Sequence, residues 1–262
     1  MSWSGYSLAK WKSFLISRFF RLYPAFAAIA LIEIFFYAYG GIMGYSYKFG
    51  EVTLLQLITN FTWTAAFFSQ DWFVPVFWTL AIEAQFTFLI LFVYPLLNHK
   101  NELVRVSFLL VLVMINYFVG RGETIFSYSA IFGMGMMVYL YYVKQLRLVL
   151  FIPLLIAAYL SYRLGVSSWH ANVAFGTILI VAFIPQFHAR WIKYLGRFAY
   201  SYFLIHITFG GSVLFHLRFF PDVWYYQALR VFIASLAAFC VSWIFYYKIE
   251  KPSHEYSRKF KS

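Results

Sequence analysis

The feature that most constrains this sequence is a series of apolar runs, most of them about 17 to 25 residues long, separated by short polar segments. A helix of that length crosses the roughly 30 Å of hydrocarbon in a lipid bilayer. The runs lack the strict alternation of a membrane β-barrel, so their backbone amides must be satisfied within helices. Of the 262 residues, 63% are hydrophobic and only 11% are charged, which disfavours a water-soluble fold. We therefore predict an all-α, polytopic transmembrane helical bundle.

Eight runs are apolar enough to be predicted as membrane spans. They cover residues 17–39, 76–97, 104–119, 125–142, 146–164, 172–187, 200–217 and 226–247. The segment 40–75 is predicted as an extracytoplasmic loop, with an interfacial helix at 52–68, because 52–68 mixes apolar and polar residues too evenly to span. The other connections are too short to hold a soluble domain. We therefore predict one membrane-embedded domain over residues 1–262.

The Lys and Arg residues are divided unequally between the two sides of this predicted bundle. Sixteen of the 21 fall on one side, and the other side receives only Lys48, Arg121, Arg163, Arg218 and Arg230. Because cytoplasmic loops carry the excess of basic residues, the first side is predicted to be cytoplasmic. Eight spans then place both termini in the cytoplasm. Basic loops beside an anionic leaflet also explain the net charge of +12 better than a nucleic-acid-binding surface does.

Glu83 and His206 are ionisable side chains inside predicted spans, where a charge costs about 2.5–3.5 kcal/mol on insertion scales. Glu83, with Gln85 nearby, is either a structural, hydrogen-bonded carboxylate or a group that orients a histidine or binds a polar substrate. His206 is either a buried histidine satisfied by a carbonyl or a general base, because neutral imidazole exchanges a proton near pH 7. The residues alone leave these alternatives open.

Three other patterns lie at span ends or within spans. Arg18 and Arg21 are three residues apart, so they share a helix face at the predicted cytoplasmic mouth of the first span. They are either positive-inside anchors or a fork that holds phosphate oxygens. The segment 248–252, Lys-Ile-Glu-Lys-Pro, is interpreted as a solvated cap that closes the last span. Gly133 and Gly135 are interpreted as a close helix crossing.

Several kinds of chemistry lack a sequence motif. The chain has no Gly-x-x-x-x-Gly-Lys loop, no His-Glu-x-x-His and no cysteine cluster, since Cys240 is its single cysteine. These are the patterns that cradle nucleotide phosphates and bind zinc. We therefore predict no metal site.

Four blocks occur in the order and spacing of one known family. They are Ser4-Gly5-Tyr6, Arg18-x-x-Arg21-x-Tyr23-Pro24, Trp78-Thr79-Leu80-x-x-Glu83-x-Gln85-Phe86, and Gly196 to His206 followed by Ile249-Glu250-Lys251-Pro252. In these blocks the chain resembles the integral-membrane acyltransferase 3 family, the O-acyltransferases that modify surface polysaccharides, lipopolysaccharides and related glycans. Thr87 departs from the pattern, because the family commonly has Tyr there.

The resemblance implies a membrane acyltransferase that transfers groups other than aminoacyl groups. It implies that acyl-coenzyme A, most simply acetyl-coenzyme A, is the donor and that Arg18 and Arg21 bind its phosphates. The implied acceptor is a hydroxyl of a glycan or lipid-linked sugar, and the implied location is the bacterial inner (plasma) membrane. Glu83 and His206 are then the expected catalytic residues.

The start of the chain departs from the family. Its members begin with two further spans, the first carrying an Arg-Gly-x-Ala…His block whose histidine is usually held to be the catalytic base. This chain opens at the end of the second span, so we expect a misassigned start, a fragment or an inactive relative. A transporter or flippase for a lipid-linked sugar is the alternative function, because buried Glu and His residues also mark substrate pathways. The absence of an internal sequence repeat favours the enzyme.

Overall fold

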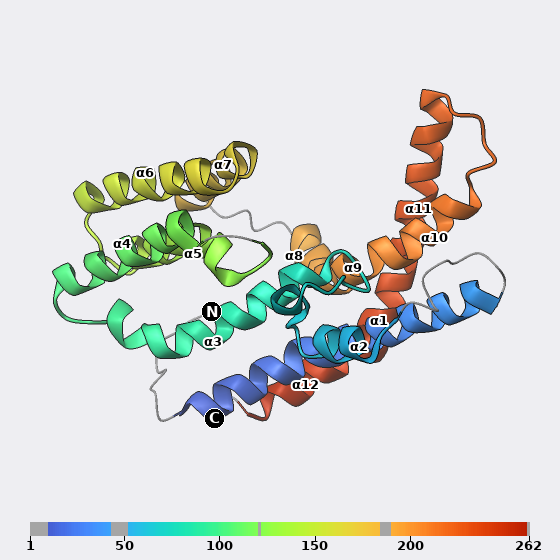
Figure 1. The fold of residues 1–262 in the computed structure, drawn as a ribbon, viewed down its shortest axis with the longest axis horizontal. Helices are drawn as coiled ribbons and strands as arrows, with labels where there is room; N and C mark the ends of the chain where they lie inside the picture. Colours follow the sequence, from blue (N-terminus) through green and yellow to red (C-terminus); the bar gives the residue numbers. More distant parts are fainter. Residues whose placement is uncertain (1–9, 43–51, 120–121, 184–189, 261–262) are drawn as a thin grey trace. The chain divides into compact units, whose positions relative to one another are not determined.

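The computed structural model describes residues 10–42, 52–119, 122–183 and 190–260, and the regular structure in these ranges is helical throughout (Figure 1). By length and composition, six helices can cross a membrane. They are Trp11–Ala38, Phe77–Leu97, Glu102–Val119, Ile125–Tyr142, Leu148–Gly165 and Trp224–Arg258. These observations confirm the predicted all-α, polytopic fold. The side of the membrane on which each terminus lies stays a prediction.

The structure differs from the expected spans at 172–187 and 200–217. Helix α7 (Ser168–Phe183) has 16 residues, as many as the predicted span but beginning four residues earlier, and its rise of about 24 Å is short for a bilayer. Residues 184–187 lie outside the described ranges. At 200–217 the helix is segmented into α9 (Ala199–Ile205), a π-helical turn η4 (His206–Gly210) and α10 (Gly211–His216). Neither segment is among the six long apolar helices.

The chain divides into two compact units. Unit 1 comprises residues 1–78 and 188–262, and unit 2 comprises residues 79–187. The prediction that residues 1–262 form one membrane-embedded domain stays a prediction.

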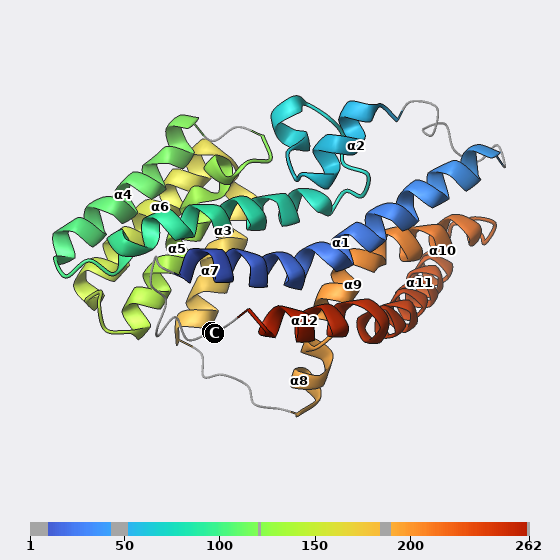
Figure 2. The ribbon, with the colours of Figure 1, turned by 90° about the horizontal axis from the view of Figure 1, so that it is seen from below.

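Unit 1 is organised around the long helix α1 (Trp11–Ile42). Helix α11 (Trp224–Phe245) continues through a π-helical turn η5 (Tyr246–Glu250) into α12 (Lys251–Arg258). Figures 1 and 2 show α12 alongside α1, whereas α11 runs in a different direction. The Ser253 hydroxyl donates a hydrogen bond to the Phe20 carbonyl, and the ring of Phe20 lies 4.8 Å from that of Tyr256. The helical chain therefore continues past 248–252 as α12, and whether 248–252 closes the last membrane span stays a prediction.

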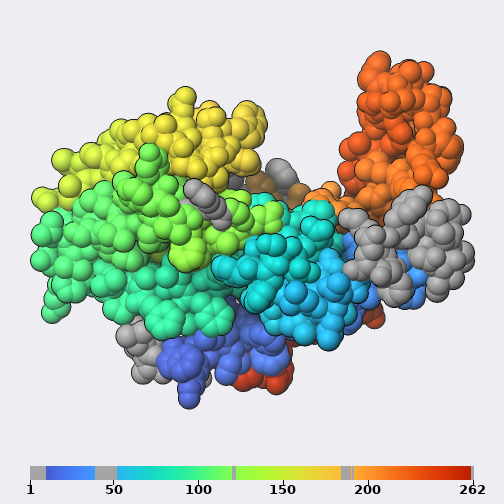
Figure 3. Space-filling model, in the orientation of Figure 1, coloured from blue at the N-terminus to red at the C-terminus, as the bar shows by residue number. Residues whose placement is uncertain are grey.

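The predicted interfacial helix at 52–68 consists of two shorter helices. Helix α2 (Leu54–Phe61) is capped by Thr53, whose hydroxyl oxygen accepts a hydrogen bond of 3.0 Å from the Gln56 amide. A 3₁₀ turn, η3 (Ala65–Phe68), follows it. The segment lies at the surface of unit 1 (Figure 3), and the apolar residues Leu54, Leu55 and Ile58 are exposed on α2. Its position at the membrane interface stays a prediction.

Unit 2 contains most of α3 (Phe77–Leu97), together with α4 (Glu102–Val119), α5 (Ile125–Tyr142), α6 (Leu148–Gly165) and α7. Small residues allow these helices to approach closely. A Cβ atom on Gly133 would lie 3.3 Å from Val113 Cγ2, whereas one on Gly135 would have no described neighbour within 4 Å. The predicted close crossing is confirmed for Gly133 and wrong for Gly135.

A second close approach, at Gly165, predicts a specific loss of stability. A Cβ atom there would lie 3.2 Å from the Cα of Tyr117, and backbone atoms of α4 cannot rotate away. We expect Gly165→Ala to destabilise the protein by about 1–3 kcal/mol, as overpacking does. Gly176→Ala on α7 is the control, because no described atom lies within 4 Å and alanine favours a helix by about 0.5–1 kcal/mol. Thermal denaturation in detergent should separate the variants, and equal midpoints would contradict the expected clash.

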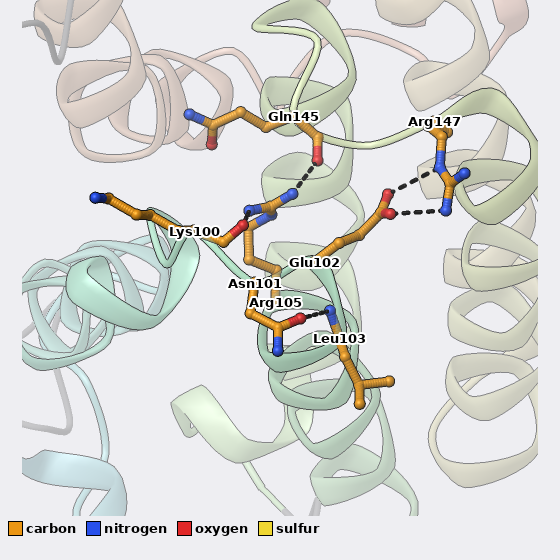
Figure 4. Close-up of polar contacts among 7 residues, drawn as sticks. All are labelled: Lys100, Asn101, Glu102, Leu103, Arg105, Gln145 and Arg147. Carbon is orange, nitrogen blue, oxygen red and sulfur yellow. Dashed lines mark hydrogen bonds and ion pairs between the residues drawn. The ribbon is translucent and has the colours of Figure 1, made fainter.

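One end of unit 2 gathers basic and polar residues (Figure 4). Arg105 is only 8% exposed and donates hydrogen bonds to the carbonyls of His99, Lys100 and Gln145, the last at 2.7 Å. These carbonyls follow the ends of α3 and α5, where backbone oxygens lack helical partners. Nearby, exposed Arg147 forms an ion pair of 2.8 Å with Glu102. The guanidinium of Arg105 therefore joins two helix ends.

Candidate functional site

A buried polar contact in unit 1 joins α9 to the turn η5. Glu250 is 1% exposed, and its Oε2 accepts hydrogen bonds from the Ser201 amide, at 3.0 Å, and from the Ser201 hydroxyl. The Nε2 atom of His254 lies 3.7 Å from the other carboxyl oxygen. The interpretation of 248–252 as a solvated cap is wrong for Glu250, although Lys248 and Lys251 are exposed. The carboxylate is instead a buried connection between two helices.

Arg18 and Arg21 lie on α1 beside this connection. Both side chains are half-buried, and Arg21 is within electrostatic reach of Glu250. The guanidinium of Arg18 lies 5.5 Å from the centre of the Phe14 ring. Leu22, the residue after Arg21, accepts a 3.0 Å hydrogen bond from the Tyr200 hydroxyl, so α9 is fixed against this part of α1.

Further cations lie around the same junction. Arg197 and Arg258 are both within electrostatic reach of Tyr246 in η5. Lys248 and Lys251 are exposed on η5 and at the start of α12. We call this region the basic end of unit 1, and it comprises Arg18, Arg21, Arg197, Lys248, Lys251 and Arg258. Its guanidinium groups suit an anion with several phosphate oxygens, because each offers forked donors.

His206 lies at the start of the π-helical turn η4. Its Nδ1 is 2.7 Å from the carbonyl oxygen of Phe203, which has no proton to give, so Nδ1 is the donor. In the neutral ring, Nε2 then carries the lone pair, and no described side chain hydrogen bonds to it. The carbonyl contact matches the structural alternative for this histidine. It also leaves a free basic nitrogen.

A groove of about 320 Å³ lies beside His206, between the α9–α10 segment and α11. Its lining is mainly apolar, with Tyr202 and Ser235 as its other polar side chains. The Tyr202 ring is stacked near the imidazole, with the ring centres 5.8 Å apart. The π-helical turn alters the helical register here, a feature frequent at functional sites. The arrangement gives a proton acceptor access to a largely apolar groove.

The predicted site residues are divided between the two units. Arg18, Arg21 and His206 belong to unit 1, whereas Glu83 belongs to unit 2 on α3. Glu83 is half-buried, and two residues further on Gln85 accepts a 2.9 Å hydrogen bond from the Ile125 amide. The functional role of each of the four stays a prediction.

Glu33 is an ionisable residue that the sequence analysis missed. It lies within α1, near the side chains of Thr208 in η4 and of Tyr37 one helical turn away. Its Oε2 and the Thr208 hydroxyl oxygen are buried without a hydrogen-bond partner in the described structure. The signal was present, because Glu33 is a single carboxylate in an otherwise apolar run and meets the same criterion as Glu83.

Comparison with known protein families gives a match over most of the chain. The family model described as an acyltransferase domain, that of the acyltransferase 3 family, matches residues 2–247. No curated protein and no solved structure matches the chain.

Proposed function

Because the chain belongs to the acyltransferase 3 family and is a membrane-bound acyltransferase, we propose that it transfers an acyl group, most simply acetyl, from acyl-coenzyme A to a hydroxyl of a glycan or lipid-linked sugar. The bacterial inner membrane is the proposed location. The observation that carries the choice of donor is the basic end of unit 1, where cations from α1, η5 and α12 surround one helix junction.

Arg18 and Arg21 are the proposed phosphate ligands. They are three residues apart on one helix, so their guanidinium groups project from the same face. Their half-buried position lowers local screening by water and strengthens their attraction for an anion. The buried Glu250 carboxylate fixes α9 and η5 beside them, which holds the basic end in shape before the donor binds.

The transfer also requires a base for the acceptor hydroxyl, and His206 is the proposed group. The bond from Nδ1 to the Phe203 carbonyl fixes the tautomer with its lone pair on Nε2. Nε2 would take the hydroxyl proton as the oxygen attacks the thioester carbonyl carbon, and the proton would leave with the thiol as the carbon–sulfur bond breaks. Glu83 remains a second proposed catalytic residue.

A binding measurement tests the donor assignment. Purified protein in detergent is titrated with acetyl-coenzyme A by isothermal calorimetry, for the wild type and for the double variant Arg18→Ala, Arg21→Ala. Each lost charge-assisted hydrogen bond is worth about 1.5–3 kcal/mol, so we expect the dissociation constant to rise about 100-fold or more.

The matched control for this titration removes two other arginines. The double variant Arg163→Ala, Arg218→Ala lowers the net charge by the same amount, and neither residue belongs to the basic end. We expect its affinity to stay within about threefold of the wild type, since exposed charges outside the site are screened by salt. Equal binding by the wild type and the Arg18, Arg21 variant would overturn the donor site. Movement of a lipid-linked sugar across vesicle membranes without any acyl donor would instead favour a flippase.

A further inference from the structure

A polar pocket lies near the C-terminal part of α1. Its volume is about 220 Å³, and its lining includes Tyr37, Gln56, Ser69, Gln70, Asp71 and Trp72. Pockets for drug-sized ligands are usually about 300–1,000 Å³, so this one suits a single small ring or a short polyol. The lining offers amide, hydroxyl and carboxylate groups, which pair with ligand hydroxyls as donors and as acceptors.

The pocket is built on a fixed scaffold. The side-chain nitrogen of Asn60 donates a hydrogen bond of 2.9 Å to the Asp71 carbonyl. Its side-chain oxygen accepts a hydrogen bond of 2.9 Å from the Phe73 amide. Gln56 donates to the same Asp71 carbonyl at 3.1 Å. The Tyr37 hydroxyl donates a hydrogen bond of 2.7 Å to the Phe73 carbonyl, and this bond joins the wall of the pocket to α1. The backbone at Asp71 and Phe73 and the side chains of Gln56 and Tyr37 are therefore held in place.

Two further polar side chains, Glu33 and Thr208, are linked to this pocket through Tyr37. Tyr37 connects the pocket to Glu33, with which it interacts directly. Oε2 of Glu33 and Oγ1 of Thr208 are buried without a well-formed hydrogen bond in the described structure, although Thr208 and Tyr37 both lie close enough to interact with the Glu33 carboxyl group. Buried polar atoms in native proteins are nearly always paired, so such atoms indicate a missing water or ligand. A ligand hydroxyl group fits between these two side chains, because it can donate a hydrogen bond to the Glu33 carboxylate and accept one from the Thr208 hydroxyl.

The pocket is acidic, whereas the basic end of unit 1 is rich in arginine and lysine. The residues that line the pocket include Asp71 but no Lys or Arg among those described, and Glu33 adds a second carboxyl group. Residues 21 and 33 of α1 are about 18 Å apart along the helix axis at 1.5 Å per residue. Phosphates favour the arginines, whereas a neutral polyhydroxylated ligand favours the carboxylates.

We propose that Glu33, Thr208, Tyr37 and the adjoining polar pocket bind the sugar ring of the acyl acceptor. This inference rests on the proposed function, since it assigns the acceptor of the same reaction to a place on unit 1. Glu33 and Thr208 hold one ring hydroxyl, and Gln56, Gln70 and Asp71 contact the others. Glu33 acts here as a binding and positioning residue.

A labelling experiment tests the site directly. Protein in detergent is treated with dicyclohexylcarbodiimide, an apolar carboxyl reagent, and modification of Glu33 is followed by peptide mass spectrometry. Millimolar methyl glycosides of glucose, galactose, mannose and N-acetylglucosamine are the probes, and we expect at least one to slow the labelling fivefold or more. Tyr37→Phe, Asp71→Asn should abolish this protection. Failure of all four glycosides to protect, or an unreactive Glu33, would overturn the proposal.

Kinetics in proteoliposomes separate this site from the donor reaction. With labelled acetyl-coenzyme A and a lipid-linked glycan extract as acceptor, we expect Glu33→Gln to raise the apparent KM for the extract at least tenfold, with donor affinity unchanged and partial rescue by Glu33→Asp. Asp222→Asn, an exposed carboxylate elsewhere in unit 1, is the control. An unchanged KM would mean that only water occupies the site. Protection by a glycoside without any acetyl transfer would preserve the sugar site and overturn the proposed function.

Discussion

Glu250→Ala is expected to destabilise the protein by about 3 kcal/mol, because it leaves the Ser201 amide and hydroxyl buried without an acceptor. Each unsatisfied buried group costs about 1–3 kcal/mol, and both groups donate to the same carboxyl oxygen. For a chain of this size, about 2–4 °C per kcal/mol predicts a fall in Tm of roughly 6–12 °C. The temperature at which half of the protein stays monodisperse in detergent, measured by size-exclusion chromatography, checks the value.

Two further variants show which property of Glu250 matters. Glu255→Ala removes a carboxylate one turn later, where the side chain is 62% exposed and 4.0 Å from Lys251, so we expect a change below about 1 kcal/mol. Glu250→Gln keeps an oxygen that can accept from Ser201 and should lose clearly less stability than Glu250→Ala. If Glu250→Gln is as unstable as Glu250→Ala, the negative charge opposite Arg21, rather than the hydrogen bonds, holds the junction. A Glu250→Ala protein as stable as Glu255→Ala would contradict the structural role.

The membrane fold could be predicted from the sequence because hydrocarbon leaves the backbone few alternatives. An apolar run of about 20 residues has to be helical in a bilayer, and the helices Phe77–Leu97 and Ile125–Tyr142 follow the predicted spans to within one residue at their starts and ends. Local composition determines such elements, so no knowledge of distant contacts was needed.

The end of the last helix could not be predicted in the same way. Pro252 lacks an amide proton and normally ends or kinks a helix, so its presence gives no indication that a helical segment continues through it. In the structure, the π-helical turn Tyr246–Glu250 comes just before it, and the proline occupies the first turn of a new helical segment. Proline is tolerated in a first turn, because its missing amide would have had no helical partner. A change of register of this kind leaves no periodic signal in the sequence.

The candidate site was predicted only where local pattern was sufficient. Arg18 and Arg21 share a helix face, as their spacing requires. The burial of Glu250 could not be foreseen, since Lys248 and Lys251 beside it suggest solvent, whereas its partner Ser201 lies 49 residues earlier in the chain. Glu33 could have been found, because the cost of a charge in hydrocarbon applies to it as it does to Glu83. The sequence does not show which helix lies beside each carboxyl group, and that neighbour determines the role of the group.

The two arginines at the polar end of unit 2 should differ sharply when they are replaced. Arg105→Met keeps most of the side-chain volume but leaves the carbonyls of His99, Lys100 and Gln145 without their donor. Hydrogen bonds to a charged group contribute about 1.5–3 kcal/mol each, and partial access of water to these carbonyls reduces their sum, so we expect a loss of about 2–4 kcal/mol. Arg147→Met breaks an ion pair whose arginine is 76% exposed and should cost at most about 1 kcal/mol.

The same detergent assay of thermal stability distinguishes burial from charge as the cause of this difference. Both substitutions remove one positive charge from the same end of unit 2, so a charge effect alone would lower both midpoints equally. Arg105→Lys adds a third comparison, because an ammonium group retains the charge but lacks the planar fork that reaches Lys100 and Gln145 together. An intermediate midpoint for Arg105→Lys would identify the fork as the element that joins the ends of α3 and α5. A midpoint equal to that of the wild type would assign the effect to charge and contradict the bridging role.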